Sequence, residues 1–123
     1  MRVLLSIKPE FASKIFDGSK GYEYRRVIFR NQKVRTVIVY ASHPIRQIIG
    51  EFQVEDILCE EPRSLWAKTK RQAGISRKRF FSYFTNKPKG YAIKVKKTRL
   101  YDEPLPLSRF TTSSPPQSYV YLP

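Results

Sequence analysis

The sequence of 123 residues has very few of the side chains that build disulfides and metal sites. It contains one cysteine and one histidine, which excludes an internal disulfide framework and disfavours a metal-ligand cluster. Cys59 and His43 form the one conceivable nucleophile pair, but Cys59 follows Ile57 and Leu58 and is more simply a small buried hydrophobic side chain. We therefore expect no metal and no cofactor, and a reducing, cytoplasmic location.

Long hydrophobic runs are also missing. No apolar stretch approaches the ~18 residues that a membrane-spanning helix needs, and residues 1–8 lack the apolar core and cleavage site of a signal peptide. A hydrophobic content of 41% is enough for one core. We expect a single domain over residues 1–123, without a membrane partner, and a monomer, because no exposed apolar seam indicates an obligate oligomer.

Acidic residues are scarce relative to basic ones. Ten Asp and Glu residues stand against 24 Lys and Arg residues, which gives a formal net charge of +14. Between Glu61 and Asp102 there is no acidic residue, yet this interval holds 13 of the basic ones. A field of this kind attracts polyanions. The charge therefore predicts a nucleic-acid partner, with RNA favoured over DNA.

The hydrophobic pattern that is present alternates between strand and helix periods. Strands are predicted over residues 2–7, 22–29, 36–41, 48–57, 90–101 and 118–122, and the last follows a loop at about 102–117. Helices are predicted from Pro9 to Gly18, from Pro62 to Gly74, and after a Ser76 cap. Gly50 indicates a bulge or bend that lets a small sheet curl. The sum is an α+β fold with a mostly antiparallel sheet and about three helices.

The segment from Asp17 to Arg26 is the strongest candidate for function. A helix end and a two-glycine turn lead into a strand where aromatic and charged residues alternate. Glu23 and Arg25 fall on one face of that strand, whereas Tyr22, Tyr24 and Arg26 fall on the other. Gly21 can bring the backbone close to a ligand. Because neither face is apolar at its start, we predict that this strand opens into a site.

A second candidate is the basic cluster at the start of the third predicted helix. Cations there oppose the helix dipole, but together with the free N–H groups of a helix start they suit a phosphate. Ordinary surface charge is the alternative interpretation. The predicted phosphate-binding residues are Arg71, Arg77, Lys78, Arg79, Lys87 and Lys89. Tyrosines near the basic residues, above all Tyr22 and Tyr24, are candidates for stacking unpaired bases.

Several of these motifs, in this order along the chain, resemble the ASCH domain family of the PUA-like superfamily. They are Leu5–Pro9, Gly18-Ser19-Lys20 with Glu23 and Arg25, Ile49–Phe52, Gly90–Ile93 and Pro115–Ser118. The resemblance implies a curled β-barrel of five or six strands, with a cleft that takes RNA or a modified nucleobase. The predicted cleft residues are Ser6, Lys8, Lys20, Tyr22, Glu23, Tyr24, Arg25, Arg26 and Ser42. A simple surface ion pair between Glu23 and Lys20 or Arg25 is the alternative for the charged residues.

The leading functional hypothesis is an RNA-binding module with a pocket for one nucleotide. A ribonuclease or an amidohydrolase in the same cleft is the alternative, with Lys20, Glu23, Tyr24 and Ser42 as its catalytic candidates. Some ASCH proteins resemble deacylases of modified cytidine, which use a lysine, a threonine three residues later and a helical glutamate. Here Glu23 occupies the threonine position and residues 62–85 contain no carboxylate; Glu23 is also expected to raise the pKa of Lys20. A regulatory adaptor in transcription or translation is the third hypothesis.

Overall fold

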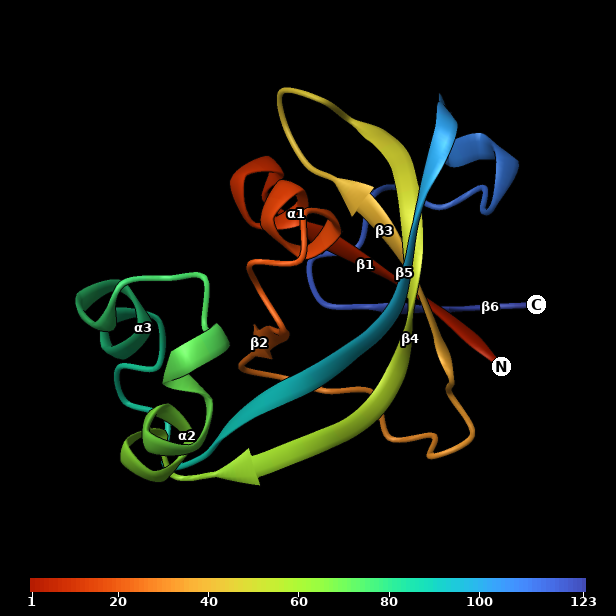
Figure 1. The fold of residues 1–123 in the computed structure, drawn as a ribbon. Helices are drawn as coiled ribbons and strands as arrows, with labels where there is room; N and C mark the ends of the chain where they lie inside the picture. Colours follow the sequence, from red (N-terminus) through yellow and green to blue (C-terminus); the bar gives the residue numbers. More distant parts are fainter.

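Six strands and three α-helices make up the computed structural model, which describes residues 1–123 (Figure 1). In chain order they are β1 (Arg2–Ile7), α1 (Pro9–Phe16), β2 (Tyr22–Arg25), β3 (Thr36–Ala41), β4 (Gln47–Glu60), α2 (Pro62–Thr69), α3 (Arg77–Tyr83), β5 (Gly90–Leu105) and β6 (Val120–Leu122). Short 3-10 turns follow α2 and β5, at Lys70–Gln72 and Leu107–Arg109. None of the helices is long and apolar enough to cross a membrane.

All six strands belong to one sheet with the order β2-β5-β4-β3-β1-β6. Every neighbouring pair is antiparallel except β1 and β3, which run parallel from Arg2 opposite Thr36 to Ile7 opposite Ala41. The α+β class and the mostly antiparallel sheet are thus confirmed. The sheet is curled but open, because its edge strands β2 and β6 do not pair with each other, so the term barrel describes it only loosely.

The curl is carried by the two long strands β4 and β5 (Figure 1). Their pairing shifts register three times, and the first shift lies between Ile48 and Gly50. A Cβ atom at Gly50 would lie 2.5 Å from the carbonyl oxygen of Arg99 on the neighbouring strand. The bend predicted at Gly50 is therefore real, and it exists where the two backbones approach too closely for a side chain.

Three hydrophobic clusters hold the elements together. The largest joins α1 to the sheet through residues such as Ile15, Val37 and Phe52. A second cluster packs Leu65 and Phe80 of residues 62–89, here called the helical lobe, against β2 and β5. The third cluster lies under β6. Figure 1 shows α1 beside β1 and β3, the helical lobe near the far end of the β4–β5 hairpin, and β2 between them.

Some predicted boundaries are wrong. The strand predicted over residues 22–29 ends at Arg25, because Arg25 lies opposite Tyr91 and its partner β5 begins only one residue earlier, at Gly90. The loop predicted at 102–117 starts too early, since β5 continues to Leu105 and pairs there with Ile48. The helix predicted to reach Gly74 leaves the α-helical form after Thr69.

Cys59 and the two chain ends are the remaining local features. Cys59 is exposed rather than buried, because it alternates along β4 with Leu58, which packs on the helical lobe. The two chain ends lie side by side, since β1 pairs with β6 and the Arg2 guanidinium donates to the carbonyl oxygen of Pro123 (3.1 Å). Figure 1 shows both ends on the side of the sheet away from the helical lobe.

Candidate functional site

A cavity of about 460 Å³ opens between the β1–α1 junction, β2 and the helical lobe. This volume lies within the range of ~300–1,000 Å³ that is typical of small-ligand sites. Its lining residues are Ser6, Ile7, Lys8 and Phe11; Lys20, Glu23, Tyr24 and Arg25; Ile75, Arg79, Ser82 and Tyr83; and Gln117. Six of the nine predicted cleft residues are therefore in its wall.

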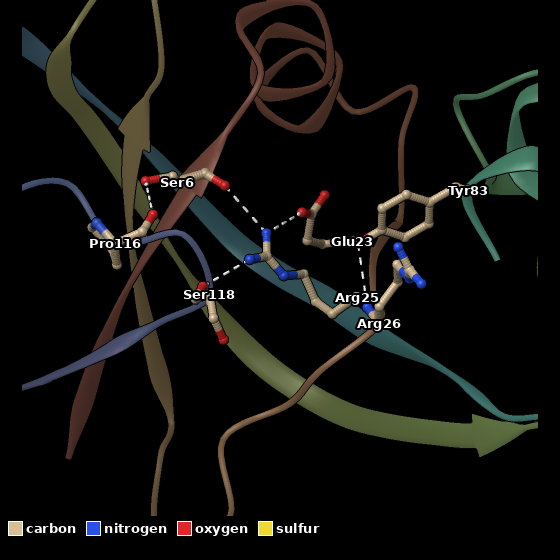
Figure 2. Close-up of polar contacts among 7 residues, drawn as sticks. All are labelled: Ser6, Glu23, Arg25, Arg26, Tyr83, Pro116 and Ser118. Atoms are coloured by element: carbon tan, nitrogen blue, oxygen red, sulfur yellow. Dashed lines mark hydrogen bonds and ion pairs between the residues drawn. The ribbon is translucent and has the colours of Figure 1, made fainter. Parts of the chain in front are cut away.

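Arg25 is the centre of a buried polar network (Figure 2). Its Nη1 donates to Glu23 Oε2 (3.2 Å) and to the Ser6 carbonyl oxygen (3.2 Å), and its Nη2 donates to the Ser118 carbonyl oxygen (2.7 Å). The Ser6 hydroxyl donates in turn to the carbonyl oxygen of Pro116 (2.7 Å). The network joins β1, β2 and the segment that precedes β6 into one wall.

The Glu23 carboxylate lies inside this wall with 5% of the residue exposed. Burial raises the pKa of Glu23, and the nearby charges of Arg25 and Lys20 oppose that rise. Only Oε2 is bonded within the protein: no protein donor reaches Oε1, which Figure 2 shows turned away from the Arg25 guanidinium. The surface ion pair considered from the sequence is thus a buried one with a free acceptor.

Lys20 is almost completely buried, with 2% exposed. Its Nζ donates to the Ala73 carbonyl oxygen (2.6 Å) and lies 5.1 Å from the centre of the Phe11 ring and 4.6 Å from that of Tyr24. Burial lowers the pKa of Lys20 to about 8, and this outweighs the opposite effect of Glu23. The expectation that Glu23 would raise the pKa of Lys20 overall is therefore wrong, because it left out desolvation.

Two glycines make this position of Lys20 possible. Gly74 has a φ of +63°, and a Cβ atom there would lie 2.6 Å from Cβ and Cγ of Lys20. The lysine stem thus runs across a surface that only glycine leaves open. Gly21 also permits a close approach, but its neighbour is the Gln72 side chain, with 2.7 Å from a built Cβ to Oε1. The close approach that Gly21 permits is therefore made to a protein side chain.

The burial of Lys20 should make the stability of the fold depend on pH. Between its folded pKa of about 8 and its ordinary value of 10.5, the unfolded chain binds more protons, so raising the pH stabilises the folded form. From about pH 8 to about pH 10, the wild type should gain on the order of 2 kcal/mol relative to the Lys20→Met variant. Urea unfolding at a series of pH values measures this difference. The exposed-site variant Lys78→Met should show no such trend, and a pH-independent gap for Lys20→Met would contradict the assignment.

The two tyrosines of the cavity have different roles. The Tyr24 hydroxyl lies 2.7 Å from Thr69 Oγ1, and because Thr69 donates to the Leu65 carbonyl oxygen, Tyr24 is the donor in this pair. Its proton is thus directed into the helical lobe, and burial raises the pKa of Tyr24 to about 12. The Tyr83 hydroxyl instead accepts from the Arg26 backbone N–H (3.2 Å), which leaves its own proton free to donate. Tyr83 is therefore better placed than Tyr24 to donate a hydrogen bond to a ligand.

The predicted phosphate-binding residues have different surroundings in the structure. Arg79 lies at the cavity wall, and both of its terminal nitrogens donate to the exposed Glu10 carboxylate (3.1 and 2.9 Å). Arg77 lies over the Phe81 ring at 4.9 Å. Arg71, Lys78 and Lys89 are exposed, Lys87 is half-buried, and no acidic side chain pairs with any of these four. The predicted Ser76 cap is present, since Ser76 Oγ accepts from the Arg79 N–H (3.2 Å). Phosphate binding by the cluster stays a prediction.

Three predicted cleft residues lie outside the cavity lining: Tyr22, Arg26 and Ser42. Ser42 adjoins the end of β1, where its N–H donates to the Ile7 carbonyl oxygen (3.0 Å). Conversely, Phe11, Ile75, Ser82, Tyr83 and Gln117 line the cavity without having been predicted as site residues. The spacing of Ser82 and Tyr83 from Arg79, at three and four residues along a helix, was a usable signal for them. Gln117 lies within the Pro115–Ser118 motif of the ASCH resemblance, which was its signal in the sequence.

Comparisons with known proteins agree in fold and family. The sequence profile of the ASCH domain matches residues 5–102. The crystal structure of ASCH from Zymomonas mobilis superposes with a TM-score of 0.91 and 28% identity, covering 99% of this chain and 87% of that one. A Z. mobilis protein named ASCH domain-containing ribonuclease is 32% identical over 89 residues, which is 72% of this chain and 60% of the relative.

A longer relative is also similar. Large ribosomal subunit protein uL22 of Ureaplasma parvum is 31% identical over 98% of this chain, which spans only 39% of that protein's length. The profile match extends over most of the residues of β1 to β5, including the Lys20, Glu23 and Arg25 positions. The chain belongs to the ASCH domain family.

Proposed function

We propose that this protein binds single-stranded RNA, with one base in the cavity and the flanking phosphates on the cations around it. The observation that carries the proposal is the buried Glu23 carboxylate, which presents a free oxygen to a cavity whose other charged lining residues are all cations. RNA is preferred over DNA because a relative of 32% identity is named a ribonuclease.

The charges of the cavity separate a place for a base from a place for phosphates. Lys8, Lys20, Arg25 and Arg79 line it, and Glu23 is the sole carboxylate in the wall. Arg25 uses three of its five N–H donors on Glu23 and two carbonyl groups, so most of its hydrogen-bonding capacity is taken up inside the protein. Lys8 is exposed and has no acidic partner. A phosphate would therefore be attracted to the mouth, whereas a base fits the deeper part beside Glu23.

Aromatic rings in the wall supply a surface on which a base can stack. The Phe11 ring already lies against the cations of Lys20 (5.1 Å) and Arg79 (4.9 Å). The Tyr83 ring belongs to a residue that is 38% exposed, and it contacts Phe84 edge-on. More of its face is therefore open than that of Phe11. Stacking of a base on an aromatic side chain contributes about 1–3 kcal/mol and tolerates any sequence. Tyr83 is the ring that best fits this role.

Phosphate contacts by the helical lobe should appear in the salt dependence of binding. In the Lys78→Ala/Lys89→Ala variant, affinity should fall similarly for all sequences, and the slope of log K against log salt should become shallower by about 0.7 per lost contact. Fluorescence anisotropy with a labelled single-stranded RNA measures both quantities. The Lys33→Ala/Arg109→Ala variant changes the charge equally on exposed residues outside the lobe and should match the wild type. A salt-independent affinity of the wild type would contradict the proposal.

RNA cleavage is a second candidate function, favoured by the position and chemistry of Lys20. With a pKa of about 8, about a tenth of this amine is neutral at pH 7. A neutral amine can take the proton of a ribose 2′-hydroxyl, whose oxygen then attacks the adjacent phosphorus. The 5′-oxygen leaves with a proton, for which the Tyr83 hydroxyl is a donor, and a 2′,3′-cyclic phosphate remains. Deacylation of a cytidine fits less well, because no helical carboxylate lines the cavity.

A further inference from the structure

We propose that the cavity selects bases that carry an exocyclic amino group, such as cytosine and adenine, over uracil, and that Glu23 Oε1 makes this selection. The inference rests on the proposed RNA binding and specifies which base edge the site accepts. It follows from three properties of Glu23: its isolation as a carboxylate, its free oxygen and its fixed orientation.

The first two properties define what the ligand must offer. Glu23 is buried, yet Oε1 receives no hydrogen bond from the protein, whereas Oε2 accepts from Arg25 Nη1. Oε1 is not among the fully buried polar atoms without a partner, so it is open to the cavity, and a ligand that supplies an N–H or O–H there gains a hydrogen bond to a carboxylate oxygen. A phosphate would bring a second negative charge beside Glu23 and is disfavoured at this point.

The third property makes the selection specific. Arg25 is itself bonded to the carbonyl oxygens of Ser6 and Ser118. The residues before and after Glu23 along β2 are both paired with β5. The Glu23 side chain is therefore held by groups that do not move with the ligand, and Oε1 keeps one direction. Sites preorganised in this way discriminate between ligands by leaving the wrong one unpaired.

Base chemistry then decides between the candidates. The 4-amino group of cytosine and the 6-amino group of adenine can donate to Oε1. Uracil has an oxygen at the same 4-position, and its lone pairs would face those of the carboxylate. Cytosine and uracil are nearly identical in size, so a difference between them reports the hydrogen bond rather than the fit.

The Glu23→Gln variant should reverse the preference. Arg25 Nη1 needs an acceptor at the Oε2 position, so the amide oxygen of the new side chain remains there. The amide NH₂ group consequently takes the position of Oε1, and the site presents a donor in place of an acceptor. A donor there suits the 4-oxygen of uracil and is poorly matched to an amino group.

The test compares short oligomers of cytidine, adenosine and uridine by fluorescence anisotropy at one salt concentration. We expect the wild type to bind the cytidine and adenosine oligomers about tenfold more tightly than the uridine oligomer. Glu23→Gln should bind uridine best. The control Glu60→Gln removes the same charge from a residue that pairs with Lys68 (2.9 Å) outside the cavity lining, and it should keep the wild-type order. The two amino-base oligomers distinguish cytosine from adenine as the occupant.

The possible results separate the inference from the function on which it rests. Equal binding of all three oligomers by the wild type would overturn the base selection while RNA binding stands. An unchanged order in folded Glu23→Gln would overturn the role of Glu23. If Glu23→Gln does not fold, as judged by urea unfolding, the wild-type comparison of cytidine with uridine still decides the selection. Binding of none of the oligomers at low salt would overturn the proposed function itself.

Discussion

Replacing Arg25 by leucine should lower the free energy of unfolding by about 3–5 kcal/mol, because it leaves a buried carboxylate without its cation. Glu23 would keep its burial but lose the Nη1 donor at 3.2 Å, and the Ser6 and Ser118 carbonyl oxygens would lose theirs. Urea unfolding of Arg25→Leu against the wild type, monitored by circular dichroism, measures the loss.

A second variant shows whether the unpaired carboxylate is the cause. Replacing a buried ion pair by two apolar side chains is often nearly neutral, so Arg25→Leu/Glu23→Leu should recover most of the stability. Arg26→Leu changes the same residue type at the next, exposed position and should stay within about 0.5 kcal/mol of the wild type. A double variant no more stable than the single one would assign the loss to the two carbonyl groups instead.

If the protein cleaves RNA, Lys20→Met and Tyr83→Phe should each slow cleavage by about 100-fold or more, the usual effect of losing a general base or acid. Tyr24→Phe should keep the wild-type rate, because its hydroxyl donates to Thr69 and not to the cavity. It should cost only about 1 kcal/mol of stability for the lost hydrogen bond. The wild-type rate should rise with pH up to about 8, as Lys20 loses its proton.

Single-turnover assays with end-labelled RNA measure these rates, and the cyclic phosphate product identifies attack by the 2′-hydroxyl. A substrate with one 2′-deoxynucleotide at the cleavage position should remain intact there. Equal losses in Tyr24→Phe and Tyr83→Phe would contradict the assignment of separate roles. Absence of cleavage by the wild type would leave RNA binding as the function.

The elements that short-range patterns control could be predicted from the sequence. The β-branched run of residues 36–41, the helix start at Pro9 and the bend at Gly50 depend on neighbours along the chain, and the structure has each of them there. The turn before β2 and the alternation in β2 were likewise enough to bring Lys20, Glu23 and Arg25 to one cavity.

The chemistry within the cavity could not be predicted, because it depends on distant residues. The low pKa of Lys20 requires burial against Ala73, which is 53 residues away. Arg25 depends on Ser118, at a separation of 93 residues. Tyr24 and Tyr83 are both tyrosines with basic residues within four positions, and only their contacts with Thr69 and with the Arg26 N–H distinguish their hydroxyl groups. Charge patterns predicted a strand that does line a cavity, but not the protonation of its side chains.

The adjacency of the two chain ends makes this domain suitable for circular permutation. Because β1 and β6 are paired and the Arg2 side chain reaches Pro123, a short linker can join the ends without disturbing the sheet. New ends can then be opened in the exposed turn around Pro44, between β3 and β4. Attachment to a surface or to a reporter domain through the original ends places the attached body on the side of the sheet away from the helical lobe, which forms part of the cavity wall (Figure 1).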